Sequence, residues 1–208
     1  MRAAKKPSNQ ELRTRKDLLQ AAGRLMKQGR KPTLEEVAKE ALVSRATAYR
    51  HFGNVDAVLA EAPVDEAVGD LTAIFAGNDS DDAEVRIDEA EAAMHRVTYA
   101  SEAQLRLMLA HSIARVADDG SPPKRQNRRT PLIEAALATT RQRFRKSDYH
   151  NLCAALAMIF GTESMIVARD VICIDEPTAR RVKSWAVRAL VRAALEDAPR
   201  GKRRWGRE

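Results

Sequence analysis

One stretch of the chain, residues 33–59, most constrains the fold, because it contains the signals for two short helices joined by a tight turn. Thr33 precedes a run of apolar residues at helical spacing, and Glu36 follows three residues later, which is the pattern of a capping box. Ser44 can cap a second helix over residues 45–51. The stretch therefore predicts a helix, a turn, a second helix and the start of a third.

The second of these helices has two faces of different character. Ala48 and Phe52 are expected to pack inward, which leaves a polar, basic outer face of the size that a DNA major groove accepts. Arg45 lies early in the helix and can donate two hydrogen bonds to guanine, while Ala46 and Thr47 can meet a thymine methyl group. The other residues suit contacts to phosphate, and Arg50 could reach either. The predicted DNA-binding residues are Thr33, Ser44, Arg45, Ala46, Thr47, Tyr49, Arg50 and His51.

The charge of the chain is concentrated around this stretch. Residues 1–60 hold 13 Lys or Arg against 6 Asp or Glu, whereas residues 61–208 hold 23 of each, so that the whole net charge of +7 belongs to the first segment. Basic residues can serve only solubility, but their coincidence with the motif favours a polyanionic partner. Double-stranded DNA is the partner predicted.

The motif also carries a resemblance. Thr-Leu-Glu-Glu-Val-Ala, followed by Val-Ser-Arg-Ala-Thr-Ala-Tyr-Arg-His-Phe-Gly, resembles the helix-turn-helix of TetR-family transcriptional regulators, and the match covers roughly residues 12–60. The resemblance implies a homodimer with a DNA-binding N-terminal bundle. It also implies a variable C-terminal domain that binds a small effector and releases the operator.

Three positions depart from the pattern of that family. Leu42 replaces the usual turn glycine and is expected at positive φ, at a cost of about 1 kcal/mol or more. Ala48 replaces a bulky aliphatic residue, which thins the packing under the second helix. The lysine usual early in the following helix is replaced around Asn54, which removes one expected phosphate contact.

Composition extends the helical prediction to the whole chain, because alanine is abundant and runs of β-branched residues are short. We predict an all-α fold of about nine helices, with an N-terminal three-helix bundle that contains the helix-turn-helix. The predicted domains are a DNA-binding domain at residues 1–60, a larger helical effector and dimerisation domain at residues 61–198, and a basic tail at residues 199–208. Pro63 should kink or break the fourth helix, either as a hinge or as a simple end.

The last two helical patterns are the longest, over residues 147–170 and 175–196. In the TetR family the corresponding pair forms a four-helix bundle with its copy from a second subunit, and small residues would permit the close approach of helices. These faces could instead serve only the intrachain core. The predicted dimer-interface residues are Ala154, Ala157, Gly161, Trp185 and Ala189.

Signals for catalysis are weak, since the chain has no Gly-rich phosphate loop, GxSxG, HExxH or CxxC motif. We predict no enzyme, no cofactor and no metal site. Cys153 and Cys173 lie in apolar surroundings, which favours buried, inert thiols over a redox pair. An interior histidine is more often a hydrogen-bonded core residue, but the predicted effector pocket consists of Met108, His111, Arg115 and Glu163.

The longest uncharged run, residues 149–162, is shorter than the roughly 20 residues of a membrane span, and no secretory signal is present. A cytoplasmic protein without a membrane partner is expected. The predicted function is a transcriptional regulator, a repressor released from a near-palindromic operator by a small molecule. The alternative is an effector-less DNA-binding protein whose C-terminal domain recognises a protein, and an enzyme with an incidental helix-turn-helix is disfavoured.

Overall fold

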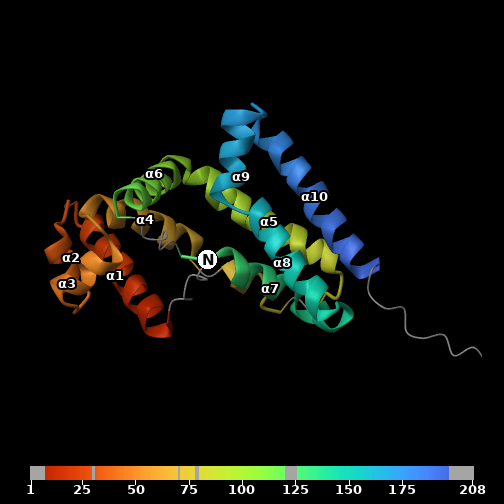
Figure 1. Ribbon diagram of the computed structural model, residues 1–208, viewed down its shortest axis with the longest axis horizontal. Coiled ribbons are helices and arrows are strands. Elements are labelled where there is room, and N and C mark those ends of the chain that lie inside the picture. The colour runs from red at the N-terminus through yellow and green to blue at the C-terminus, as the bar shows by residue number, and fades with distance from the viewer. Residues whose placement is uncertain (1–7, 30, 70, 78–79, 120–125, 197–208) are drawn as a thin grey trace, which may run out of the picture. The chain divides into compact units, whose positions relative to one another are not determined.

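The computed structural model describes residues 8–29, 31–69, 71–77, 80–119 and 126–196, with the backbone alone for 115–119. This part of the chain forms ten α-helices and three shorter helical segments without a strand (Figure 1), which confirms the predicted all-α class. The predicted basic tail lies outside the described residues.

The chain divides into two compact units, and each is built from two separate stretches of sequence. The first unit contains Met1–Gly69 and Ala100–Gln126, and the second contains Asp70–Tyr99 and Asn127–Glu208. The functional division predicted near residue 60 remains a prediction.

The first unit has five helices around an apolar core. They are α1 (Asn9–Lys27), α2 (Leu34–Glu40), α3 (Arg45–His51), α4 (Val55–Val68) and α6 (Glu102–Asp119). Leu18, Val37, Ala48 and Val58 bring one fully buried side chain from each of the first four helices into this core. Burying such apolar surface is the main contribution to the stability of a small bundle.

Side-chain caps fix where these helices begin. Ser8 and Thr33 each accept a hydrogen bond from the backbone amide three residues on, and Glu11 and Glu36 complete the two capping boxes. Asn54 caps α4 by accepting from the amide of Ala57. The capping box predicted at Thr33 is therefore confirmed.

Of the kink or break predicted at Pro63, the break is wrong, because α4 continues through the proline to Val68 and has Gly69 as its C-cap at φ +49°. A proline in a helix interior removes one backbone hydrogen bond. The apolar residues on either side of it, Ala62 and Val64, are both buried, and their packing keeps the helix continuous.

A buried ion pair joins three helices of the first unit. Arg15 of α1 pairs with Glu61 of α4, and both side chains are at least nine-tenths buried. The Arg15 guanidinium also donates to the carbonyl of His51 at 3.1 Å and lies 4.1 Å from the ring centroid of Phe52. One side chain thus holds the end of α3 to α1 and α4.

The second unit has its own core, to which Ile87, Ile133, Leu156, Phe160 and Val187 contribute fully buried side chains. Its elements are η1 (Leu71–Phe75), α5 (Ala83–Ala100), α7 (Arg129–Leu137), η2 (Ala138–Arg143), α8 (Lys146–Ile159), α9 (Thr162–Ile166), η3 (Val167–Val171) and α10 (Glu176–Glu196).

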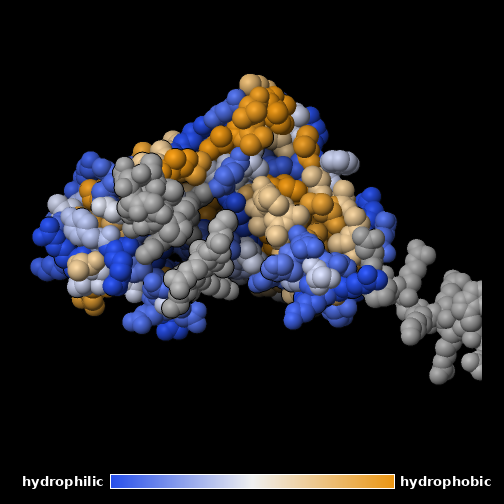
Figure 2. Space-filling model, in the orientation of Figure 1, coloured by the Kyte–Doolittle hydropathy of each residue, from blue (hydrophilic) through white to orange (hydrophobic). Residues whose placement is uncertain are grey.

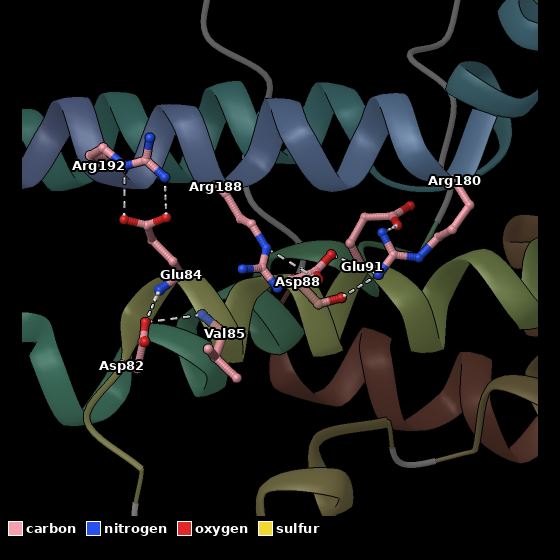
Figure 3. Close-up of polar contacts among 8 residues, drawn as sticks. All are labelled: Asp82, Glu84, Val85, Asp88, Glu91, Arg180, Arg188 and Arg192. Atoms are coloured by element: carbon pink, nitrogen blue, oxygen red, sulfur yellow. Dashed lines mark hydrogen bonds and ion pairs between the residues drawn. The ribbon is translucent and has the colours of Figure 1, made fainter. Parts of the chain in front are cut away.

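A ladder of ion pairs connects α5 to α10 (Figure 3). Glu84 pairs with Arg192 at 2.6 Å, and Asp88 receives both Arg188 at 2.8 Å and Arg180 at 2.6 Å. Burial opposes the ionisation of Asp88, but the hydrogen bonds from the two arginines outweigh it and lower the pKa of this carboxyl below its usual value. The ladder therefore consists of ionised groups at neutral pH.

The single helix expected over residues 147–170 is wrong, because α8 ends at Ile159 and α9 begins at Thr162 after a bend of 48°. Gly161 occupies the bend at φ +87°, and a Cβ there would lie 2.8 Å from Nε of Arg129. The Arg129 guanidinium donates to the carbonyl of Ala157 at 3.2 Å and pairs with Glu163. A cation from α7 thus fills the space at the bend.

Both cysteines are free, but only Cys153 is buried. Cys173 is exposed at φ +51°, because it lies in the turn between η3 and α10 and not on a helix face, so that the expectation of a second buried thiol is wrong. Within the described residues, no single helix is both long and apolar enough to cross a membrane, and by those criteria alone the bent pair of α8 with Thr162–Val171 could.

Candidate nucleic-acid interface

The turn between α2 and α3 has the backbone conformation that the sequence predicts. Leu42 lies at φ +57°, and its side chain is 94% exposed. The amide of Leu42 donates to the carbonyl of Lys39 at 3.1 Å, and the amide of Val43 donates to the carbonyl of Ala38 at 3.0 Å. A leucine therefore closes a turn that suits glycine sterically.

The start of α3 is fixed by Ser44, whose hydroxyl accepts from the amide of Thr47 at 3.1 Å and lies 2.8 Å from the Thr47 hydroxyl. Ser44 is exposed and Thr47 is half-buried. Both residues belong to the predicted DNA-binding set; in this structure the Ser44 hydroxyl caps α3, and the Thr47 hydroxyl is hydrogen-bonded to it.

The remaining predicted DNA-binding residues differ in exposure: all but one lie on the outer surface of the motif. Arg45, Ala46, Tyr49 and Arg50 are exposed on α3, and Thr33 is exposed at the start of α2. His51 differs from them, because only 8% of it is exposed. The inner face of α3 packs in the core through Ala48 and Phe52.

A carboxylate that the sequence analysis did not select lies beside Arg45. Oε1 of Glu35, on α2, is 2.9 Å from Nε of Arg45 and accepts a hydrogen bond from the Tyr49 hydroxyl at 3.1 Å. The Arg45 guanidinium lies 5.5 Å from the centroid of the Tyr49 ring. A hydrogen bond from its own backbone amide, followed by the bond from Tyr49, lowers the pKa of Glu35.

An open groove of about 520 Å³ runs along the same side of the first unit. Its lining residues are Ser8, Gln10, Glu11, Thr14, Val43, Ser44, Thr47, Arg50 and His51. Gln10 and Thr14 belong to α1, and neither is among the predicted DNA-binding residues. Helical periodicity identifies the buried face of α1, but it does not show which exposed residues lie beside α3.

The predicted effector-pocket residues fall in both units. Met108 and His111 are on α6 in the first unit, and the side chain of Arg115 lies outside the described part of the chain. Glu163 is on α9 in the second unit, where it pairs with Arg129. The effector pocket therefore stays a prediction. Among the described residues, no group of three or more His, Cys, Asp or Glu side chains could hold a metal ion.

The predicted dimer-interface residues lie on α8 and α10, or between α8 and α9, and they differ in exposure. Trp185 is 72% exposed and Ala154 is also exposed, whereas Ala157 and Ala189 are half-buried and Gly161 is buried. Other large apolar side chains of this unit are exposed as well. They are Met158, Val167, Val171, Ile172 and Val182, and Figure 2 shows apolar surface gathered over α9 and the segment that follows it.

The comparison with protein families agrees with this geometry. Residues 18–62, which contain α2, α3 and parts of α1 and α4, match the tetR family of bacterial regulatory proteins. Among solved structures, the chain is similar to a TetR transcriptional regulator from Rhodococcus sp. RHA1, with 18% sequence identity, a TM-score of 0.49, and coverage of 87% of this chain and 97% of that chain. No curated protein matches the chain. Residues 18–62 of this chain thus form a helix-turn-helix domain of the kind that defines the tetR family of bacterial regulatory proteins, which supports a DNA-binding transcriptional regulator.

Proposed function

We propose that the protein is a repressor that binds a near-palindromic operator as a homodimer and is released by a small-molecule effector. The observation that carries the DNA-binding part is the asymmetry of α3, which buries Ala48 and Phe52 and exposes Arg45, Tyr49 and Arg50. A short helix held from behind with a cationic outer face suits insertion into a major groove. The protein then acts in the cytoplasm, as a regulator and not as an enzyme.

Arg45 is the residue that we propose reads a base. Its side chain is 70% exposed, and its ion pair with Glu35 involves Nε. The two terminal amino groups thus remain able to donate to O6 and N7 of guanine. Ala46, beside it, is small enough to let a thymine methyl group approach.

The groove between α1 and α3 supports a path for the sugar-phosphate backbone. Arg50 brings a positive charge to it, and Gln10, Thr14 and Ser44 bring uncharged hydrogen-bonding groups. The one carboxylate in the lining, that of Glu11, accepts hydrogen bonds from Ser8 in the capping box. Contacts of this kind fix the register of the protein on the duplex without reading sequence. The phosphate contacts predicted for Thr33 and His51 are part of the same proposal. The contact of His51 would use the small part of this residue that is exposed.

Dimerisation is supported by the apolar surface of the second unit, since exposed Trp185, Met158 and Val171 would lose contact with water in a subunit interface. A two-fold dimer would place two copies of α3 about one helical turn, ~34 Å, apart along the DNA. An effector that prefers another spacing of the two copies would lower DNA affinity by linkage.

Operator footprinting with the Arg45→Ala variant tests the proposal. We expect a loss of roughly 1–3 kcal/mol in operator binding and a relaxed preference at one base pair in each half-site, because a bidentate contact is removed. Arg181→Ala, which removes the same charge from an exposed position of α10, serves as the control and should bind like the wild type. An equal loss on operator and random DNA would show that Arg45 is only a phosphate contact.

A screen of metabolites for loss of operator binding distinguishes the two regulatory alternatives. Release by a small molecule supports the effector-responsive repressor. Release by a protein alone supports the regulator whose C-terminal half recognises a protein partner.

A further inference from the structure

An acidic side chain occupies the surface that we propose approaches DNA. The side chain of Glu35 on α2 is 41% exposed, and its Oε1 atom forms an ion pair with Nε of Arg45 and accepts a hydrogen bond from the hydroxyl of Tyr49. A carboxylate at such a surface repels phosphate, so that it weakens binding unless it has another effect.

The geometry of the ion pair between Glu35 and Arg45 gives Glu35 a second effect, which is to orient the guanidinium. A guanidinium is planar and carries five N–H donors in a fixed fork, so that an ion pair on its Nε side favours orientations in which the terminal amino groups point away from Glu35. Tyr49 lies one turn beyond Arg45 on α3, and its bond to the same oxygen fixes the carboxylate in turn. Arg45 is therefore held at its inner edge, while its outer edge carries the two donors that a guanine requires.

The charge of Glu35 also favours base reading by Arg45 over phosphate binding. A glutamate is ionised at neutral pH at its ordinary pKa, and the hydrogen bonds of Glu35 lower that pKa further, so that the carboxylate offsets the charge of Arg45. An unpaired arginine gains most of its affinity for DNA from phosphates, whatever the sequence. Pairing with Glu35 reduces that gain and leaves the directional donation to a base edge.

We propose that Glu35 is a specificity-determining positioning residue, which holds Arg45 so that this side chain reads a base in preference to binding phosphate. The inference rests on the DNA-reading role proposed above for Arg45. It predicts that the loss of Glu35 weakens operator binding relative to random DNA, although a negative charge has been removed from the interface.

The chain offers a matched control on the same helix. Glu40 is also on α2, its side chain is 40% exposed, and it pairs at 2.8 Å with Arg24 of α1, not with α3. Dissociation constants of Glu35→Ala and Glu40→Ala are to be measured on the footprinted operator and on a random duplex. We expect the ratio of random to operator constants to fall about tenfold for Glu35→Ala, which is the scale of one bidentate contact, and to stay within about twofold of the wild type for Glu40→Ala.

Two further measurements separate positioning from simple repulsion or misfolding. On operators substituted at one base pair at a time, Glu35→Ala should lose preference at the base pair that Arg45→Ala affects and nowhere else. In the Arg45→Ala background, Glu35→Ala should leave the ratio unchanged. A loss spread over all base pairs, or an undiminished effect without Arg45, would overturn the proposal.

The outcomes also separate this inference from the proposed function. A wild-type protein without preference for any duplex would refute the DNA-reading role itself. A wild-type footprint together with equal ratios for Glu35→Ala and Glu40→Ala would refute only the role of Glu35.

Discussion

At the scale of single residues, the backbone conformation of Leu42 is energetically unfavourable, although this residue lies inside the DNA-binding motif. A residue with a Cβ at φ +57° is disfavoured by roughly 1–2 kcal/mol, and the exposed side chain recovers almost none of this by burial. The turn is nevertheless formed, because the apolar faces of α2 and α3 on either side of it are buried in the core.

We predict that Leu42→Gly stabilises the protein by about 0.5–1 kcal/mol, which is the relief of strain less the greater freedom of glycine in the unfolded chain. Urea unfolding followed by circular dichroism measures the change. Leu42→Ala removes the same side chain but keeps the Cβ and should bring no gain. A destabilised glycine variant, or an equal gain with alanine, would contradict this account.

The residue scale also shows what sequence can predict. The caps at Thr33 and Ser44 are determined by neighbours within three residues, so that the sequence predicts them, whereas the positive φ of Leu42 was predicted from the resemblance to a family with glycine at this turn. The contact between Glu35 and Arg45 depends on how α2 and α3 pack together. Helical periodicity contains no signal for that packing.

At the scale of elements, α4 is held to α1 by two ion pairs of different burial. Glu61 and Arg15 are at least nine-tenths buried, whereas the side chains of Glu66 and Lys27 are 56% and 66% exposed. Exposed pairs contribute little because water and salt screen them, while removing one partner of a buried pair leaves an uncompensated charge.

We therefore predict that Glu61→Gln lowers the free energy of unfolding by about 3–5 kcal/mol and that Glu66→Gln lowers it by less than about 1 kcal/mol. Both substitutions remove one negative charge from the same helix, so that they differ chiefly in burial. Chemical unfolding of the two variants at one ionic strength provides the measurement. Similar losses for both would contradict a structural role for the buried pair.

Two errors of the sequence analysis also belong to the scale of elements. Proline suggested a break at residue 63 that does not occur, and the helical apolar pattern predicted one helix over residues 147–170 where Gly161 introduces a bend. In each case tertiary packing decides the outcome, through the buried neighbours of Pro63 and through Arg129 at the bend. A sequence window of one helix contains neither of these partners.

At the scale of the whole molecule, each of the two units combines two stretches that are separate in the sequence, because the chain enters the first unit twice. The first unit recruits α6 from the middle of the sequence, and the second unit begins with η1, immediately after the first stretch ends. Charge and motif predict the DNA-binding part of this arrangement because both are local. The membership of α6 depends on long-range contacts and was not predictable.

The proposed dimer leads to a prediction at the same scale. Trp185→Glu should convert the protein to a monomer in analytical ultracentrifugation and reduce operator affinity at least ~10-fold, because a buried tryptophan is a typical interface hot spot. Leu107→Glu places the same charge on an exposed apolar position of α6 and should leave the assembly state unchanged. A dimer that persists in Trp185→Glu would exclude α10 as the centre of the interface.

The bend at Gly161 has a consequence for how such an assembly could vary. Position 161 excludes other side chains for two separate reasons, since its backbone angle suits glycine alone and the guanidinium of Arg129 occupies the space where a Cβ would be. The direction in which α9 and η3 leave α8 is therefore determined by two residues that are distant in the sequence, Arg129 and Gly161. The exposed residues Val167 and Val171 follow this bend in the chain. A substitution at position 129 or 161 would therefore change the orientation of the apolar surface without altering any of its own residues.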